Sequence, residues 1–259
     1  MTILRKVKDE FMSILLPQKD IIYGPVSSRR LGRSLGINIS STHKKICSFD
    51  CVYCQYGRTG AYNLKELPSI DEVITKVEKA LSVHPELDYI TFSGNGEPTM
   101  HPNFKEIAEG VRELRDRLLP NIPIALLTNS SFITEKRIQE ALEFIDYPIF
   151  KLDAGDEQTF KSINRPLTNV SIEQIIDTLA DFDSTVTQTL FVDGNYQNSK
   201  GNSLQRWLEA ISRIKPNEVQ IYSIDRKPAE EEVKICPRSV LNSIAEIVKN
   251  ELGIKIKVY

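Results

Sequence analysis

Short apolar runs alternate along the chain with longer segments in which apolar residues recur at helical spacing. The runs have the length of strands, and the segments between them have the period of amphipathic helices. The pattern predicts strands at 35–39, 89–92, 122–127, 149–152, 186–192, 219–222 and 254–258. It predicts helices at about 70–81, 103–118, 134–144, 171–182, 203–214 and 237–251. Two of these helices open on capping-box pairs, namely Ser69 with Glu72 and Ser171 with Gln174.

This rhythm of strand, helix and strand predicts an α/β protein with a parallel sheet and right-handed crossovers. Six such units fit an incomplete (β/α)6 parallel barrel, and an open doubly wound sheet is the alternative. Residues 1–22 mix charged and apolar residues at helical spacing, so we expect a short N-terminal helical extension there. No linker is evident after it, so residues 23–259 are expected to form one domain.

The composition is that of an ordinary globular enzyme, with 41% hydrophobic and 26% charged residues in 259 positions. No run approaches the roughly 18 apolar residues of a membrane span, so no membrane partner is expected. A net charge of −2 argues against a broad nucleic-acid surface. Four cysteines, three of them close together, argue against a disulfide framework and for a reducing, cytoplasmic compartment.

The three clustered cysteines are Cys47, Cys51 and Cys54, with three and two residues between them. Three thiolates on one short loop can hold three irons of a cubane cluster and leave the fourth iron without a protein ligand. A cluster that only carries electrons normally has four thiolates, so the open iron indicates a ligand from outside the protein.

A structural zinc site is the alternative for these cysteines, with Cys236 or His43 as the fourth ligand. Structural zinc sites usually combine two pairs of closely spaced ligands. This chain has one triplet and no second pair, so its spacing favours the iron cluster.

A second motif follows the predicted strand 89–92, where the sequence reads Ser93-Gly94-Asn95-Gly96-Glu97. Glycines let a backbone approach a ligand closely, and a carboxylate can accept a hydrogen bond from an ammonium group. A glycine-rich turn alone is a weak signal. Its place at a strand end, some forty residues after the cysteines, makes it a strong one.

The cysteine spacing, with the aromatic Tyr53 before the last cysteine, resembles the radical S-adenosylmethionine (SAM) superfamily. The turn resembles the motif by which that superfamily binds the methionine amino group, with Gly94, Gly96 and Glu97 as the matching residues and Asn95 at a glycine position of the family. The resemblance implies a 4Fe-4S cluster on the three cysteines that chelates SAM. It further implies reductive cleavage of SAM to a 5′-deoxyadenosyl radical, an oxidoreductase-like activity.

Reactive residues of parallel barrels lie at the carboxyl ends of the strands. The resemblance implies that Asn129 and Asp153 reach the SAM ribose and that Lys151 reaches its carboxylate. An ion pair of Lys151 with Asp153 or a neighbouring carboxylate is the alternative. We assign no catalytic residue beyond the cluster ligands.

The segment from 23 to 58 is basic, with six lysines and arginines against one aspartate, a local charge of +5. Arginine forks bind carboxylate and phosphate, so Arg29, Arg30 and Arg33 are candidate substrate residues. Equally, they could neutralise the anionic cluster loop. We expect a small anionic substrate rather than tRNA, because RNA would need more basic residues. The family also implies a reductant such as flavodoxin or ferredoxin.

Four segments carry a closer resemblance: the arginine segment, the cysteine loop, the Glu97 turn, and residues 151–156 with Asn164-Arg165-Pro166. Together they resemble a subgroup of radical SAM proteins of mostly unassigned activity that is related to wybutosine-synthesis enzymes. The resemblance covers roughly residues 20–225. Those enzymes act on tRNA with a second cluster, for which this chain has only Cys236 left. The predicted function is therefore a radical SAM enzyme of unidentified substrate. A tRNA-modifying enzyme, or a noncatalytic iron-sulfur or zinc module, is the alternative.

Overall fold

The computed structural model describes residues 15–259, which form two compact units. Unit A consists of Pro17–Ser48 and Gly60–Lys151. Unit B consists of residues 15–16, Phe49–Thr59 and Leu152–Tyr259. The chain therefore passes from one unit to the other within the cysteine segment.

The sheet of unit A has five strands in the order β1-β2-β3-β4-β5. The first two form an antiparallel hairpin, and the pairs from β2 to β5 are parallel. Ile37, Phe92 and Leu126 are register partners near the ends of neighbouring strands, so the segments that follow them leave the sheet at one carboxyl edge. The strands are β1 Ile22–Ser28, β2 Gly32–Ile37, β3 Tyr89–Phe92, β4 Ile124–Thr128 and β5 Tyr147–Lys151.

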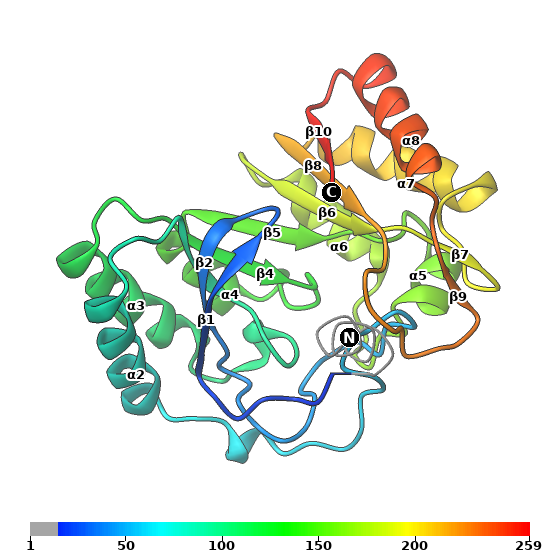
Figure 1. Cartoon of the computed structure of the whole chain (residues 1–259). Helices are drawn as coiled ribbons and strands as arrows, with labels where there is room; N and C mark the ends of the chain where they lie inside the picture. The colour runs from blue at the N-terminus through cyan, green and yellow to red at the C-terminus, as the bar shows by residue number, and fades with distance from the viewer. Residues whose placement is uncertain (1–14) are drawn as a thin grey trace, which may run out of the picture. The chain divides into compact units, whose positions relative to one another are not determined.

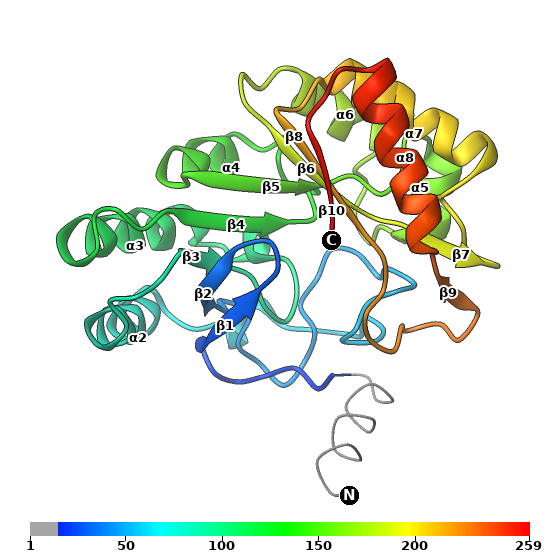
Figure 2. The same cartoon turned by 45° about the horizontal axis from the view of Figure 1, so that its top comes forward.

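Three helices bury the core of unit A: α2 Ile70–Val83, α3 Phe104–Leu118 and α4 Lys136–Ala141. In Figures 1 and 2, α2 and α3 lie side by side. The predicted capping box starts α2, because Ser69 Oγ accepts the Glu72 N–H while the Glu72 carboxylate accepts the Ser69 N–H. The buried positions of α2 recur every three to four residues, and each buried valine or leucine side chain contributes about 1.5–3 kcal/mol.

Unit B has a parallel sheet in the order β6-β8-β10 and a separate antiparallel pair, β7 with β9. Trp207 of α7 is buried, and its indole Nε1 donates to the carbonyl of Leu152 at 3.0 Å. The elements are α5 Glu157–Ile163, α6 Ile172–Ala180, β6 Val186–Leu190, β7 Val192–Gly194, α7 Gly201–Ile214, β8 Glu218–Tyr222, β9 Val233–Ile235, α8 Arg238–Glu251 and β10 Ile256–Val258.

All seven predicted strands are present, 89–92 with the predicted ends and the others with shifted ends, and the predicted helices are present in their regions. The pattern missed β1, α5 and β9, which are short or carry few buried residues. It also predicted one strand over 186–192, where the structure has β6 and, in a separate sheet, β7. The predicted helical extension falls largely on residues 1–14, outside the described residues, and residues 15–20 form no regular element. The domain limits drawn from the sequence stay a prediction.

Candidate functional site

None of the four cysteines forms a disulfide, and Cys47, Cys51 and Cys236 are buried while Cys54 is partly exposed. Cys47 belongs to unit A, and Cys51 and Cys54 belong to unit B. Among residues 15–259 no three His, Cys, Asp or Glu side chains are grouped as the ligands of one metal ion. In a cubane cluster each thiolate binds a different iron.

In unit A, Glu97 follows β3 and its carboxylate is buried, with 1% of the residue exposed. One oxygen accepts hydrogen bonds from the Thr99 N–H (3.1 Å), the Thr99 hydroxyl (2.6 Å) and the Thr128 hydroxyl (2.7 Å). The other accepts the Asn129 N–H at 2.5 Å. Burial raises the pKa of Glu97, and these donors oppose the rise. The carboxylate therefore joins the turn after β3 to the end of β4.

The glycines of this turn are required by the protein itself. A Cβ on Gly96 would lie 1.6 Å from the carbonyl oxygen of Ile46, and one on Gly94 would lie 2.3 Å from Asn38 Oδ1. The segment that leads to Cys47 is bonded to the turn in both directions. The Ile46 N–H donates to the carbonyl of Asn95 (3.1 Å), and the Glu97 N–H donates to that of Ile46 (2.9 Å). These two hydrogen bonds hold Ile46, next to Cys47, against the turn, and Gly96 permits the close approach because it has no Cβ.

Asn129 follows β4 and contacts Cys47. Its side-chain Nδ2 lies 3.6 Å from Cys47 Sγ and 2.8 Å from Ser48 Oγ, and its Oδ1 accepts the Ser131 N–H at 2.9 Å. The Ser48 and Ser131 hydroxyls are hydrogen-bonded at 2.6 Å. Asn129, predicted from the family resemblance as a ribose contact, is thus placed against Cys47.

In unit B the cysteine segment is attached to the end of α5. The Asp50 N–H donates to the Asn164 carbonyl (3.1 Å) and the Val52 N–H to the Ile163 carbonyl (3.0 Å). The segment also closes on itself, because Asp50 Oδ1 accepts the Thr59 N–H at 2.6 Å. These bonds hold Cys51 beside the helix end.

A buried polar network surrounds Cys51. Asn164 Nδ2 lies 3.5 Å from Cys51 Sγ and 2.7 Å from Asp153 Oδ2, and the Tyr53 hydroxyl donates to the same carboxylate oxygen. The other oxygen of Asp153 accepts the Leu190 N–H at 2.9 Å. Burial, and then the negative charge of Asp153, raise the pKa of Tyr53 well above its ordinary value. Tyr53 and Asp153, two predicted cofactor residues, are thus brought together.

Asn164 was singled out from the sequence only as part of a family segment. Its position directly after a short helix that the hydrophobic pattern did not predict explains why its role was missed. The carbonyl of Lys151, the last residue of β5, accepts a hydrogen bond from Ser130 Oγ at 3.0 Å. Its predicted contact with the SAM carboxylate stays a prediction.

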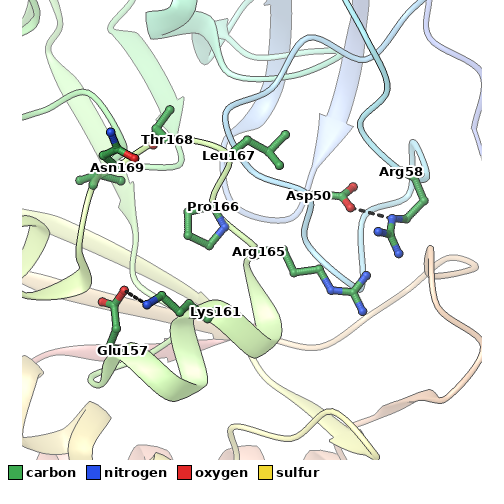
Figure 3. A pocket seen from close by; sticks show the side chains of 10 residues that line it. Asp50, Arg58, Glu157, Lys161, Arg165, Pro166, Leu167, Thr168 and Asn169 are labelled. Atoms are coloured by element: carbon green, nitrogen blue, oxygen red, sulfur yellow. Dashed lines mark ion pairs between the residues drawn. The ribbon is translucent and has the colours of Figure 1, made fainter.

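Unit B also has a pocket of about 550 Å³ beside the cysteine segment. Figure 3 shows its charged side chains in pairs: Arg58 with Asp50 (2.6 Å) and Lys161 with Glu157 (3.2 Å). Arg165 pairs with Glu230 at 2.5 Å, and Arg58 also contacts Glu230. Each cation already faces a carboxylate, so the pocket is not an anion site of free guanidinium groups.

The three arginines predicted to bind substrate lie at the opposite end of the unit A sheet from Glu97 and Asn129. Arg29 and Arg30 form the β1–β2 turn, and Arg33 lies near the start of β2. The Arg33 guanidinium bonds to Glu86, which precedes β3, at 2.8 Å. Four residues of strand, about 13 Å, separate Arg33 from the end of β2. The structure does not bring this segment together with Cys47 or Glu97 in unit A.

Among residues 15–259, no helix combines the length and the apolar character that a membrane crossing requires.

A family model described as the radical SAM superfamily matches residues 41–198. A UPF0026 protein of Methanocaldococcus jannaschii is 32% identical over 242 residues, 90% of this chain and 72% of that protein. A protein named GTPase Obg from Brachyspira hyodysenteriae is 32% identical over 219 residues, 82% of this chain but only 31% of that protein.

Solved structures share the fold. A radical SAM methyltransferase from Sphaerobacter thermophilus matches with a TM-score of 0.64 and 16% identity, covering 87% of this chain and 65% of that one. TYW1 with a lysine-pyruvate adduct bound matches with a TM-score of 0.58 and 13% identity, covering 86% of this chain and 75% of that one. These matches confirm the predicted α/β fold class with its mostly parallel strands.

Proposed function

The chain belongs to the radical SAM superfamily, and we propose that it is an enzyme that cleaves SAM reductively with a 4Fe-4S cluster. One observation carries the proposal: the matched range 41–198 contains Cys47, Cys51 and Cys54, none of which forms a disulfide. Three thiolates would bind three of four irons and would leave one open for the amino and carboxylate groups of SAM.

The donors around the cysteines fit such a cluster. Thiolates bound to iron carry negative charge and accept hydrogen bonds, and Cys47 and Cys51 each have an amide nitrogen within hydrogen-bond distance of the sulfur. The chemistry that the cofactors supply when bound is one-electron cleavage of the sulfonium and hydrogen abstraction by a 5′-deoxyadenosyl radical.

The residues of the chain position these cofactors and exclude water from them. We propose that SAM is bound by the residues that match the family: Tyr53, Gly94, Gly96, Glu97, Asn129, Lys151 and Asp153. The carboxylates of Glu97 and Asp153 already accept hydrogen bonds from the protein. Besides contacting SAM, as proposed, they hold the turn after β3, the end of β4 and Tyr53 in place.

Anaerobic reconstitution tests the proposed cluster. The wild-type protein should bind about four irons per chain, because three thiolates and one open iron define a 4Fe-4S cluster. Cys51→Ala should lose the iron and the visible absorption. Cys236→Ala is the matched control, since Cys236 is also buried but its neighbours are Ser223 and Pro237. Loss of iron in Cys236→Ala with retention in Cys51→Ala would refute the assignment.

The partners follow from the proposed chemistry. A one-electron donor such as flavodoxin or ferredoxin would reduce the cluster. A small anionic molecule stays the proposed substrate, ahead of tRNA; the net charge of −2 argues only against the broad basic surface that RNA binding needs. Binding of tRNA that weakens steeply with salt would reverse that order.

A further inference from the structure

We propose that Asn129 and Asn164 are positioning residues for the cluster, whose amide N–H groups donate to the ligand sulfurs of Cys47 and Cys51 and raise the reduction potential of the cluster. The inference rests on the proposed function, because it concerns a cluster held by these cysteines. The two contacts lie in different units and are built from different elements, so each supports the inference independently.

In unit A, the orientation of the Asn129 amide is set by its other bonds. Oδ1 accepts the Ser131 N–H at 2.9 Å, so the opposite side of the amide, Nδ2, faces Cys47 Sγ at 3.6 Å. The backbone of Asn129 is fixed in turn, because its N–H donates to the buried carboxylate of Glu97. The chain of contacts runs from Glu97 through Asn129 to the sulfur.

In unit B, an acceptor sets the orientation of the Asn164 amide. The carboxylate of Asp153 can only accept when ionised, so the group 2.7 Å from it is the NH2 of Asn164. The same Nδ2 lies 3.5 Å from Cys51 Sγ. The backbone carbonyl of Asn164 accepts the Asp50 N–H, so the residue before Cys51 is bound to the residue that donates to its sulfur.

Both amides are buried, with 7% of Asn129 and 1% of Asn164 exposed. A hydrogen bond in a water-poor surrounding is electrostatically stronger than one in water. Reduction adds negative charge to the cluster and its thiolates, and an N–H donor stabilises the more negative form. The two donors therefore favour the reduced state, and their loss should lower the potential.

The test is a redox titration of the anaerobically reconstituted full-length protein, followed by the electron paramagnetic resonance signal of the reduced cluster. Asn129→Ala and Asn164→Ala should each shift the midpoint to a lower potential, and the double variant should shift it further. Two buried asparagines serve as matched controls. Asn38 donates to the carbonyls of Gln18 and Asp20, and Asn198 donates to those of Asp153 and Leu190.

Asn38→Ala and Asn198→Ala should keep the wild-type midpoint. Unchanged midpoints in Asn129→Ala and Asn164→Ala, with the cluster present, would overturn the inference and leave the proposed function standing. A wild-type protein that takes up no cluster would overturn both.

A second measurement covers variants that fail to fold or to hold iron. In wild-type protein labelled with ¹⁵N only at asparagine, electron-nuclear double resonance should detect ¹⁵N coupled to the reduced cluster. The coupling should persist in Asn38→Ala. Absence of any coupled ¹⁵N in the wild-type protein would show that neither amide bonds to a ligand sulfur, and would overturn the inference.

Discussion

At the residue scale, the turn after β3 is organised by the same groups that the sequence predicts to bind a ligand. The glycines at 94 and 96 admit Asn38 and Ile46, and the carboxylate of Glu97 bonds to Thr99, Thr128 and Asn129. The sequence motif predicts a ligand-binding turn, and that role stays a prediction. The structure shows that the same residues fix the segment before Cys47.

Gly96→Ala should destabilise the protein strongly, because its Cβ would meet the backbone oxygen of Ile46 at 1.6 Å, and backbone cannot yield as a flexible side chain can. Overpacking of this kind typically costs about 1–3 kcal/mol. Gly60→Ala is the control, since a Cβ there has no neighbour within 4 Å. Denaturant unfolding measures both, and equal stability of the two variants would contradict the described contact.

Glu97→Gln should lower the free energy of unfolding by about 1–3 kcal/mol, because an amide nitrogen replaces an oxygen that accepts buried hydrogen bonds. The pH dependence has a definite sign. Burial raises the folded-state pKa of Glu97 above the ordinary 4.5, so the contribution of Glu97 to stability falls as pH rises from 4.5 through that folded pKa.

The stability difference between wild type and Glu97→Gln should therefore be larger near pH 4.5 than at pH 8. Unfolding curves for both proteins across this range measure it. A difference that grows with pH would show that the donors outweigh burial and that the pKa is lowered.

At the element scale, two attachments organise unit B. The end of α5 holds the cysteine segment through the carbonyls of Ile163 and Asn164. At the start of β8, Glu218 forms ion pairs with Lys255 (2.7 Å), just before β10, and with Lys257 (2.9 Å) in β10. Although burial opposes ionisation of Glu218, the ammonium groups outweigh it and lower its pKa to about 2.

Glu218→Gln should lower the free energy of unfolding at pH 7 by about 1–2 kcal/mol, a value reduced by the solvent exposure of both lysines. Because the folded-state pKa is depressed from 4.5 to about 2, this stabilisation is complete above pH 4.5 and is lost as pH falls towards 2. Glu251→Gln, at an exposed position in α8, should have no such effect. A Glu218→Gln difference that persists unchanged below pH 2.5 would contradict the ion-pair account.

At the scale of the whole molecule, the alternation of strands and helices was predictable because apolar periodicity and capping boxes are local signals. The capping boxes at Ser69 and Ser171 are present as predicted. The hairpin strand β1 was not predictable, since its residues are mostly part-exposed and include Gly24 and Pro25. Contacts such as Asn164 with Cys51 join residues 113 positions apart, and no local pattern encodes them.

The position of the arginine segment could not be predicted either. Its nearness to the cysteines in sequence suggested a shared site, but β2 intervenes and carries Arg33 to the other end of the unit A sheet. Arg33 and Cys47 are therefore close in sequence, but the strand between them places them at opposite ends of the unit A sheet.

The central claim, reductive cleavage of SAM, is tested most directly by measuring 5′-deoxyadenosine after anaerobic incubation of reconstituted protein with SAM and dithionite. Wild type and Cys236→Ala should release 5′-deoxyadenosine, and Cys51→Ala should release none. Iron-loaded wild-type protein that forms no 5′-deoxyadenosine, or Cys51→Ala protein that forms as much as wild type, would contradict the claim.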